Sequence, residues 1–290
     1  MKKWLILIAV ILVLCIIEWI RELNTFRVTQ YKIATKKLNG LERECKIVFL
    51  SDLHNNRYGK DNQRLVNAIA EQNPDVILIG GDMVVGKPNR PFDVAERFVA
   101  QLTKLCPVYY ANGNHEFRMK IYPEIYGETY TQYKSKLEYA GVKFLENSHV
   151  NFEWENQEIQ IWGLEIPKEG YKKFIKTQLS VEHVRDAIGE ADHTKCQILL
   201  AHNPGYIDTY KQWGADIILS GHLHGGVVRI PMLGGVISPQ FRLFPKYSGE
   251  YTKEGETSIV VSKGLGTHTI KVRFLNPAEI IVLHVGGEKH

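Results

Sequence analysis

Five short apolar runs, each followed closely by side chains that can bind a metal ion, restrict the fold of this chain more than any other feature. The runs cover residues 46–50, 75–80, 107–111, 195–201 and 216–220. Their length and apolar composition are typical of buried strands. Strand, loop and helix patterns alternate through the first three runs. We therefore predict an α/β sheet with parallel neighbouring strands.

The rest of the chain supplies helices and further strands. Apolar residues recur at helical spacing in residues 60–72 and 91–105, and the tyrosine-rich residues 122–140 are also expected to be helical. Short helices are expected at 181–188 and 206–212. Alternating residues predict a half-buried strand at 26–33, antiparallel strands at 142–145 and 150–166 with a turn at 155–157, and late strands at 258–262 and 279–284.

The N-terminus carries an apolar run from Trp4 to Ile17. This run reaches the lower limit for a membrane-spanning helix if Glu18 lies at the interface and Trp19 anchors it there. A cleaved signal peptide and a lipoprotein signal are the alternatives. No small-x-small cleavage site follows the run, and Cys15 lacks the small residue that a lipobox places before the cysteine. We therefore favour an uncleaved membrane anchor.

The orientation of this anchor is less constrained. Lys2 and Lys3 favour a cytoplasmic N-terminus, which would place the folded domain outside the cytoplasm. Five basic residues on the other flank weaken this bias: Arg21, Arg27, Lys32, Lys36 and Lys37. An extracytoplasmic domain is the expectation, with the opposite orientation left open.

Charge and cysteine content exclude other classes of protein. The formal net charge is only +4 over 290 residues, and the basic residues are spread along the chain, so no nucleic-acid partner is expected. The four cysteines show no CxxC or paired spacing, which supports neither a zinc ribbon nor a disulfide framework.

The side chains after the five apolar runs form a coherent set of metal donors. In an open α/β sheet, sites form in the crevice at the carboxyl ends of the strands. Mixed imidazole and carboxylate donors suit Mn, Fe or Zn, and seven donors suit two ions that share one bridging carboxylate. His115 is also placed to donate to a phosphate or to protonate a leaving oxygen. The seven candidate donors are Asp52, His54, Asp82, Asn114, His202, His222 and His224.

Each of these residues has a simpler interpretation when it is considered alone. Asp52 or Asp82 could cap a helix, residues 112–113 could form a turn, and His202 could be a partly buried histidine. Their joint occurrence after five strands favours the metal site. His149, His183, His193 and His290 are predicted to lie on the surface, and His268 to line the cleft or a loop.

The motifs are similar to those of a known family. The blocks Asp52-x-His54, Gly81-Asp82, Gly113-Asn114-His115-Glu116, His202 and Gly221-His222-x-His224 resemble, in this order, the calcineurin-like metallophosphoesterases over roughly residues 46–285. Residues 225–226, 229–231, 244–247, 264–266 and 273–277 resemble a bacterial membrane-associated phosphodiesterase subgroup, related to enzymes that cut UDP-2,3-diacylglucosamine at its pyrophosphate. Val227 departs from this subgroup, in which we expect a polar residue.

The resemblance implies a four-layer αββα sandwich, an α/β (α+β) fold, preceded here by one transmembrane helix. It implies that Asp52, His54, Asp82 and His224 hold one ion. Asp82, Asn114, His202 and His222 would hold the other, so that Asp82 bridges the two ions, and His115 would be the catalytic histidine. Manganese is the favoured metal. The expected domains are an anchor at 1–22, a linker and first strand at 23–45, and the metallophosphoesterase domain at 46–290.

The expected function is hydrolysis of a phosphodiester or pyrophosphate bond by a metal-bridging hydroxide. The aromatic and apolar residues 232–251 suit a membrane-proximal or lipid-linked substrate. A phosphomonoesterase of broad specificity is the alternative enzyme, and a non-catalytic metal-binding scaffold of the same fold is the alternative outside enzymes. We expect a monomer held at the membrane by its N-terminal helix.

Overall fold

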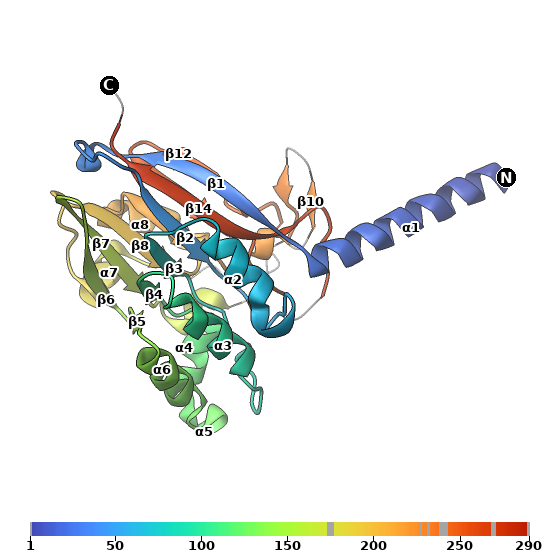
Figure 1. Ribbon diagram of the computed structural model, residues 1–290, viewed down its shortest axis with the longest axis horizontal. Helices are drawn as coiled ribbons and strands as arrows, with labels where there is room; N and C mark the ends of the chain where they lie inside the picture. Colours follow the sequence, from blue (N-terminus) through green and yellow to red (C-terminus); the bar gives the residue numbers. More distant parts are fainter. Residues whose placement is uncertain are drawn as a thin grey trace.

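Strand β2 (Cys45–Leu50) shows how the sequence builds the layers of the fold. Side chains alternate across a strand. Ile47 and Phe49 therefore pack between two sheets, whereas Val48 and Leu50 pack against helices on the outer face. In this computed structural model, which describes residues 2–172, 177–226, 228–230, 233–237, 243–267 and 271–288, two six-stranded sheets pack face to face between layers of helices (Figure 1).

The first sheet holds the N-terminal strands and the last strand of the chain. The connections between its strands β2 to β5 contain five helices: α2 (Gln63–Ala70), α3 (Asp93–Leu102), α4 (Asn114–Ile121), α5 (Pro123–Tyr126) and α6 (Thr129–Tyr139). The strands β2 to β5 are parallel to one another, and β14 runs antiparallel to β2. The spatial order is β1 (Phe26–Ala34), β14 (Ala278–Gly286), β2, β3 (Val76–Ile79), β4 (Val108–Tyr110) and β5 (Val142–Phe144).

The second sheet is built from the later part of the chain. Helices α7 (Val181–Ile188) and α8 (Ile207–Trp213) pack on its outer face through Val184, Tyr210 and Trp213. Its central strands β7, β8, β9 and β13 are parallel. The spatial order is β12 (Tyr251–Glu254), β13 (Thr257–Val261), β9 (Ile217–Ser220), β8 (Cys196–Ala201), β7 (Gln157–Leu164) and β6 (Ser148–Trp154).

Short elements complete the described fold. A two-stranded hairpin consists of β10 (Arg229–Ile230) and β11 (Gly234–Gly235). Single 3-10 turns occur at Lys36–Leu38, Lys60–Asn62, Lys168–Tyr171, Pro204–Tyr206 and His224–Gly226. The last of these turns carries the second histidine of the His-x-His motif, so this motif lies in the loop that follows β9.

Two sheets flanked by helices confirm the predicted fold class, and most predicted elements are present. The antiparallel direction expected for residues 142–145 was wrong, because β5 pairs parallel to β4. The reason is the helical crossover α4 to α6 between these strands, which returns the chain to the same edge of the sheet. Residues 122–140 form two helices that are separated at Gly127, where φ is 58°. The helix α4 and the strands β10, β11 and β12 had not been predicted.

The N-terminal helix α1 (Lys2–Asn24) extends away from the two sheets (Figure 1). It is 23 residues long and strongly apolar, and its most apolar stretch is not buried against the rest of the described chain. At 1.5 Å per residue it measures about 35 Å, compared with a hydrocarbon core of about 30 Å. By length and composition it can therefore cross a membrane.

Candidate metal centre

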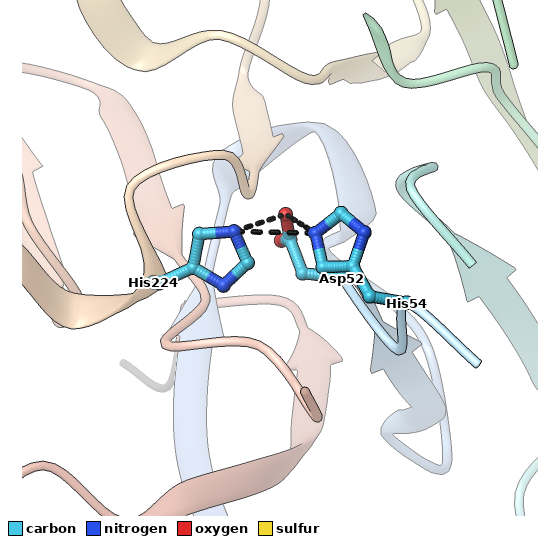
Figure 2. Close-up of side chains that lie close together, drawn as sticks. All are labelled: Asp52, His54 and His224. Atoms are coloured by element: carbon cyan, nitrogen blue, oxygen red, sulfur yellow. Dashed lines mark hydrogen bonds and ion pairs between the residues drawn. The ribbon is translucent and has the colours of Figure 1, made fainter. Parts of the chain in front are cut away.

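The five predicted segments converge at the end of the sandwich where the strands of both sheets finish. Three groups bring candidate ligand atoms within 4.8 Å of one another: Asp52 with His54 and His224, Asp82 with His202 and His222, and His54 with Asp82 and His115. All of these side chains are buried. Figure 2 shows the first group, in which the Asp52 carboxylate lies between the rings of His54 and His224.

Asp82 lies where the groups meet. Its Oδ2 is 3.1 Å from Nε2 of His202 and 3.9 Å from Nε2 of both His54 and His115. Asp52 has the equivalent place in the first group, with its Oδ1 3.5 Å from Nε2 of His224 and 3.7 Å from Nε2 of His54. Two buried carboxylates are thus surrounded by imidazole Nε2 atoms. This arrangement suits divalent cations.

The backbone fixes the tautomer of three of these histidines. Nδ1 of His54 lies 3.3 Å from the Val84 carbonyl oxygen, Nδ1 of His202 2.6 Å from that of Gly80, and Nδ1 of His224 3.0 Å from that of Gly266. A carbonyl only accepts, so Nδ1 carries the proton in each ring. The Nε2 lone pairs therefore point into the site, as in metal-binding histidines.

The Nε2 atoms of His54 and His224 lie only 3.2 Å apart. Because each ring carries its proton on Nδ1, the Nε2 lone pairs of the two rings face each other at this distance. Such a pair requires a proton or a cation to share. Because the same atoms also surround the Asp52 carboxylate, a divalent ion fits this group of residues.

His115 has the opposite arrangement. Its Nδ1 accepts a hydrogen bond from the backbone N–H of Gly86 at 2.8 Å and lies 3.1 Å from the Arg118 guanidinium. Both neighbours are donors, so the ring proton belongs on Nε2. Nε2 then faces the site as an N–H group. In this state it can donate a proton or a hydrogen bond, and it has no lone pair for a metal ion.

Asn114 supplies a second sign that cations belong here. It begins helix α4, and its amide oxygen Oδ1 is buried without a hydrogen-bond partner among the described residues. An unpaired buried carbonyl oxygen costs about 1–3 kcal/mol. A metal ion would satisfy it, and the donor set present therefore fits the metal chemistry that the sequence predicts.

The electrostatics of the centre also favour cations. Burial opposes ionisation of Asp82, but the imidazoles of His202 and His115 hold the pKa of its carboxyl well below the usual value. Burial likewise lowers the pKa of His202, yet the carboxylates of Asp82 and Asp52 raise this pKa to about 10. The carboxylates thus hold positive charge in the site, and protons compete with metal ions for the imidazoles. Metal affinity should therefore rise with pH.

Local backbone strain accompanies the site. Asp52, His54, Asp82, His222 and His224 have φ between 48° and 68°, a left-handed region that non-glycine residues seldom adopt. Such strain costs of the order of 1–3 kcal/mol per residue and concentrates at functional sites. These loops are therefore shaped for the placement of their side chains.

A glycine allows the two sheets to meet at the site. A Cβ on Gly221 would lie 1.9 Å from Oγ of Ser51 and 2.3 Å from Oδ2 of Asp52, so only glycine fits at the end of β9. This close approach lets the backbone N–H of His222 donate to the Asp52 carboxylate at 3.1 Å. The hydroxyl of Ser51 also donates to this carboxylate.

Two supporting residues were not assigned a role from the sequence. The fully buried Glu116 accepts hydrogen bonds from the backbone N–H groups of Asp82 at 2.8 Å and Met83 at 2.9 Å, and from the Tyr110 hydroxyl at 2.8 Å. Its position within the Gly113–Glu116 motif was the available signal. Tyr171 packs edge-on against His222, with ring centroids 5.2 Å apart, and no pattern in the sequence indicated this contact.

The structure also locates the remaining candidates. His149, His183 and His193 are exposed, as predicted. The basic residues Arg57, near Asp93, and Lys87 lie at the surface. Val227, His268 and His290 lie outside the described residues, as does part of the segment 232–251.

Glu116→Ala is expected to lower the free energy of unfolding by about 3 kcal/mol, because several buried donors lose their shared acceptor. Urea unfolding of the full chain in detergent measures this change. The exposed Glu124→Ala is the control and should shift stability by less than about 0.5 kcal/mol. Equal unfolding midpoints for the two variants would contradict a role of Glu116 in holding the Asp82 loop.

Comparison with known proteins agrees with this geometry. Residues 45–226 match the family model described as calcineurin-like phosphoesterase. An uncharacterized metallophosphoesterase of Helicobacter pylori J99 is 30% identical over 256 residues, which cover 86% of this chain and 61% of that protein. The chain thus spans about three fifths of this relative's length.

Two further relatives have more informative names. Phosphodiesterase YaeI of Escherichia coli K12 is 27% identical over 83% of this chain and 82% of its own length. A transmembrane protein with metallophosphoesterase domain from Danio rerio is 28% identical over 88% of this chain and 56% of its own length. The family model covers well over half of the chain. The chain therefore belongs to the calcineurin-like phosphoesterase family, and its buried histidines and aspartates form a candidate metal centre.

Proposed function

We propose that this protein is a two-metal phosphodiesterase that cleaves a phosphodiester or pyrophosphate bond beside a membrane. The observation that carries the proposal is the division of the imidazoles. His54, His202 and His224 direct Nε2 lone pairs toward Asp52 and Asp82, whereas His115 directs an N–H group into the same space. The site therefore combines metal donors with one proton donor.

The residues that would hold the ions follow from their grouping. Asp52, His54 and His224 would hold the first ion, and Asn114, His202 and His222 the second, with Asp82 shared between them. Two bound divalent ions, for which Mn²⁺ is our first choice, would activate water for attack on phosphorus and neutralise phosphate charge.

The chain's own contribution to the reaction lies mainly in His115. The Gly86 N–H and the Arg118 guanidinium on Nδ1 keep the proton on Nε2. Nε2 can then donate to a phosphoryl oxygen or to the leaving oxygen as the ester bond breaks. Burial of the ring keeps this donor away from bulk water.

A cavity of about 270 Å³ next to the second group supports a substrate with an apolar part. Leu223, which lies between the two motif histidines, lines it together with Ile207 and Pro245. Lys246, which pairs with Glu254 at 2.9 Å, adds a cation, Asn203 an amide and Asp208 a carboxylate. An apolar wall with a nearby cation suits a phosphate group joined to a lipid.

The finer assignments are part of the same proposal. We place the chain in the membrane-associated phosphodiesterase subgroup, with an anchor at 1–22, a linker and first strand at 23–45, and an extracytoplasmic domain at 46–290 that acts as a monomer. The relatives named a phosphodiesterase and a transmembrane protein support the diester substrate and the membrane location. The exposed apolar surface of α1 supports the anchor.

Hydrolysis of bis(p-nitrophenyl) phosphate by the full chain in detergent with Mn²⁺ tests the activity. We expect turnover of this diester, and slower turnover of p-nitrophenyl phosphate. Faster turnover of the monoester would favour the phosphomonoesterase alternative. Folded, metal-loaded protein without turnover in either assay would favour the non-catalytic scaffold.

Metal removal is expected to destabilise the protein. Ligands that bind only the folded state stabilise it by RT ln(1 + [L]/Kd), which is about 2.7 kcal/mol for one site at 100 times Kd. Thermal unfolding with saturating Mn²⁺ should therefore occur at a temperature several degrees higher than unfolding with a chelator. Equal unfolding temperatures under the two conditions would contradict metal binding by the folded chain.

A further inference from the structure

The last turn of α1 is bound to the domain by specific contacts. Of the described residues of this helix, Glu22 is the buried one, with 1% exposure. Its Oε2 accepts a hydrogen bond from the backbone N–H of Asn276 at 2.8 Å. One turn earlier, Trp19 Nε1 donates to the Lys271 carbonyl oxygen at 2.9 Å. These two contacts from α1 therefore hold both ends of the segment 271–276.

The segment 271–276 in turn holds His224. The buried Asn276 donates through Nδ2 to the His224 carbonyl oxygen at 2.7 Å. Gly225 permits this contact, because a Cβ there would lie 2.1 Å from the Asn276 side-chain oxygen. A path of two hydrogen bonds thus leads from the Glu22 carboxylate through Asn276 to the backbone of a candidate metal ligand.

The same segment also fixes the ring of His224. Arg273, which is 2% exposed, donates to the carbonyl oxygens of Gly266 at 2.9 Å, Gly264 at 3.1 Å and Asn276 at 3.2 Å. The Gly266 carbonyl is the acceptor that sets the tautomer of His224. Both the backbone and the imidazole of His224 therefore depend on segment 271–276.

A purely structural role explains Glu22 poorly. A carboxylate in the last turn of a helix opposes the helix dipole, and its burial adds a desolvation cost. An apolar or basic residue would end the helix at lower cost. The carboxylate does supply a strong acceptor for the Asn276 N–H at a fixed place.

We propose that Glu22 and Trp19 are positioning residues of the metal centre. The domain end of the membrane helix holds segment 271–276 and so places His224 for the first ion. The anchor would then be a part of the site as well as a tether. This inference rests on the proposed two-metal function, because it concerns the affinity for one of the two ions.

Mn²⁺ binding to the full chain in detergent tests the inference, by equilibrium dialysis and by the spin-coupled electron paramagnetic resonance signal of an ion pair. Loss of residues that orient metal ligands typically costs about 10–100-fold in affinity. We expect a loss of this size for one of the two ions in Asn276→Asp, which removes the donor to His224. Glu22→Ala, which acts one hydrogen bond further from His224, is expected to lower the affinity for the same ion roughly 3–10-fold.

Conservative variants separate positioning from general damage. Glu22→Gln keeps an oxygen acceptor for Asn276 and should bind both ions nearly as the unchanged chain does. Glu124→Ala removes an exposed carboxylate elsewhere in the chain and should also leave both affinities unchanged. Trp19→Phe keeps an aromatic ring and removes the indole N–H together with part of the ring surface, so it supplies the test if Glu22→Ala does not fold. Trp19→Phe should weaken the binding of the same ion a few-fold.

The outcomes distinguish this inference from the proposed function. Two ions bound with unchanged affinity in folded Glu22→Ala, or in folded Trp19→Phe, would overturn the inference and leave the proposed function intact. An unchanged chain that binds no Mn²⁺ would overturn both. Selective loss of one ion in the Glu22 and Asn276 variants, with the spin-coupled signal reduced at limiting Mn²⁺, would support the inference.

Discussion

Asp82→Ala is expected to abolish stable binding of both metal ions and to lower kcat/KM for a phosphodiester by roughly a thousandfold or more. The reason is its position: Oδ2 of Asp82 lies near Nε2 of His202, His54 and His115, so its carboxylate faces both groups. Without it, several buried imidazoles lose the negative charge that balances them. Metal analysis by mass spectrometry and diester hydrolysis measure the two effects.

The control for this variant is Asp186→Ala, an exposed aspartate on helix α7 that does not line the cavity. It should retain the metal content and activity of the unchanged chain. Asp82→Ala protein that still holds two ions per chain would show that Asp82 is not shared between them. The two-metal assignment would then be wrong.

His115→Ala is expected to retain both ions and to lower kcat by about 10²–10⁴-fold. Its Nδ1 is occupied by the Gly86 N–H, so the ring contributes a proton donor and no metal ligand. The size of the loss should depend on the leaving group. The rate should fall more for an alkyl phosphodiester, whose leaving oxygen needs a proton, than for bis(p-nitrophenyl) phosphate. The p-nitrophenolate group of the latter leaves without protonation.

Steady-state kinetics on these two diesters, together with metal content, separate the roles of His115. The exposed His149→Ala is the matched control and should behave as the unchanged chain does. Loss of an ion from His115→Ala would instead make this residue a ligand. Equal losses for both leaving groups would mean that His115 binds the phosphate without protonating the leaving oxygen.

The convergence of the candidate residues could be predicted from the sequence because it depends on strand ends. Asp52 follows β2 and Asp82 follows β3, and these two strands are parallel neighbours. Parallel strands finish at the same edge of a sheet, so their loops meet. The apolar runs made the strands recognisable, and the N-terminal helix α1 was recognisable for the same reason.

The direction of β5 and the helix α4 could not be predicted in this way. The run at residues 142–145 is too short to show which neighbour it pairs with, and three helices between β4 and β5 decide its direction. Residues 114–121 have weak helical amphipathicity and begin with two candidate site residues, Asn114 and His115. Packing against the first sheet outweighs the local pattern there.

Contacts between distant residues were beyond any local pattern. Glu22 and Asn276 are 254 positions apart, and neither lies near a ligand in the sequence. The proton positions of the imidazoles depend on single carbonyl or N–H groups, such as Gly80 for His202 and Gly86 for His115. Such partners become visible only when the two sheets are assembled.

The most direct test of the two-metal centre is anomalous X-ray diffraction from crystals of the full chain grown with Mn²⁺. We expect two peaks about 3.5–4 Å apart, the separation found in two-metal sites. The Asp82 carboxylate should contact both, with His224 at one peak and His202 and His222 at the other. A single peak at saturating Mn²⁺, or a peak coordinated by His115, would contradict the account.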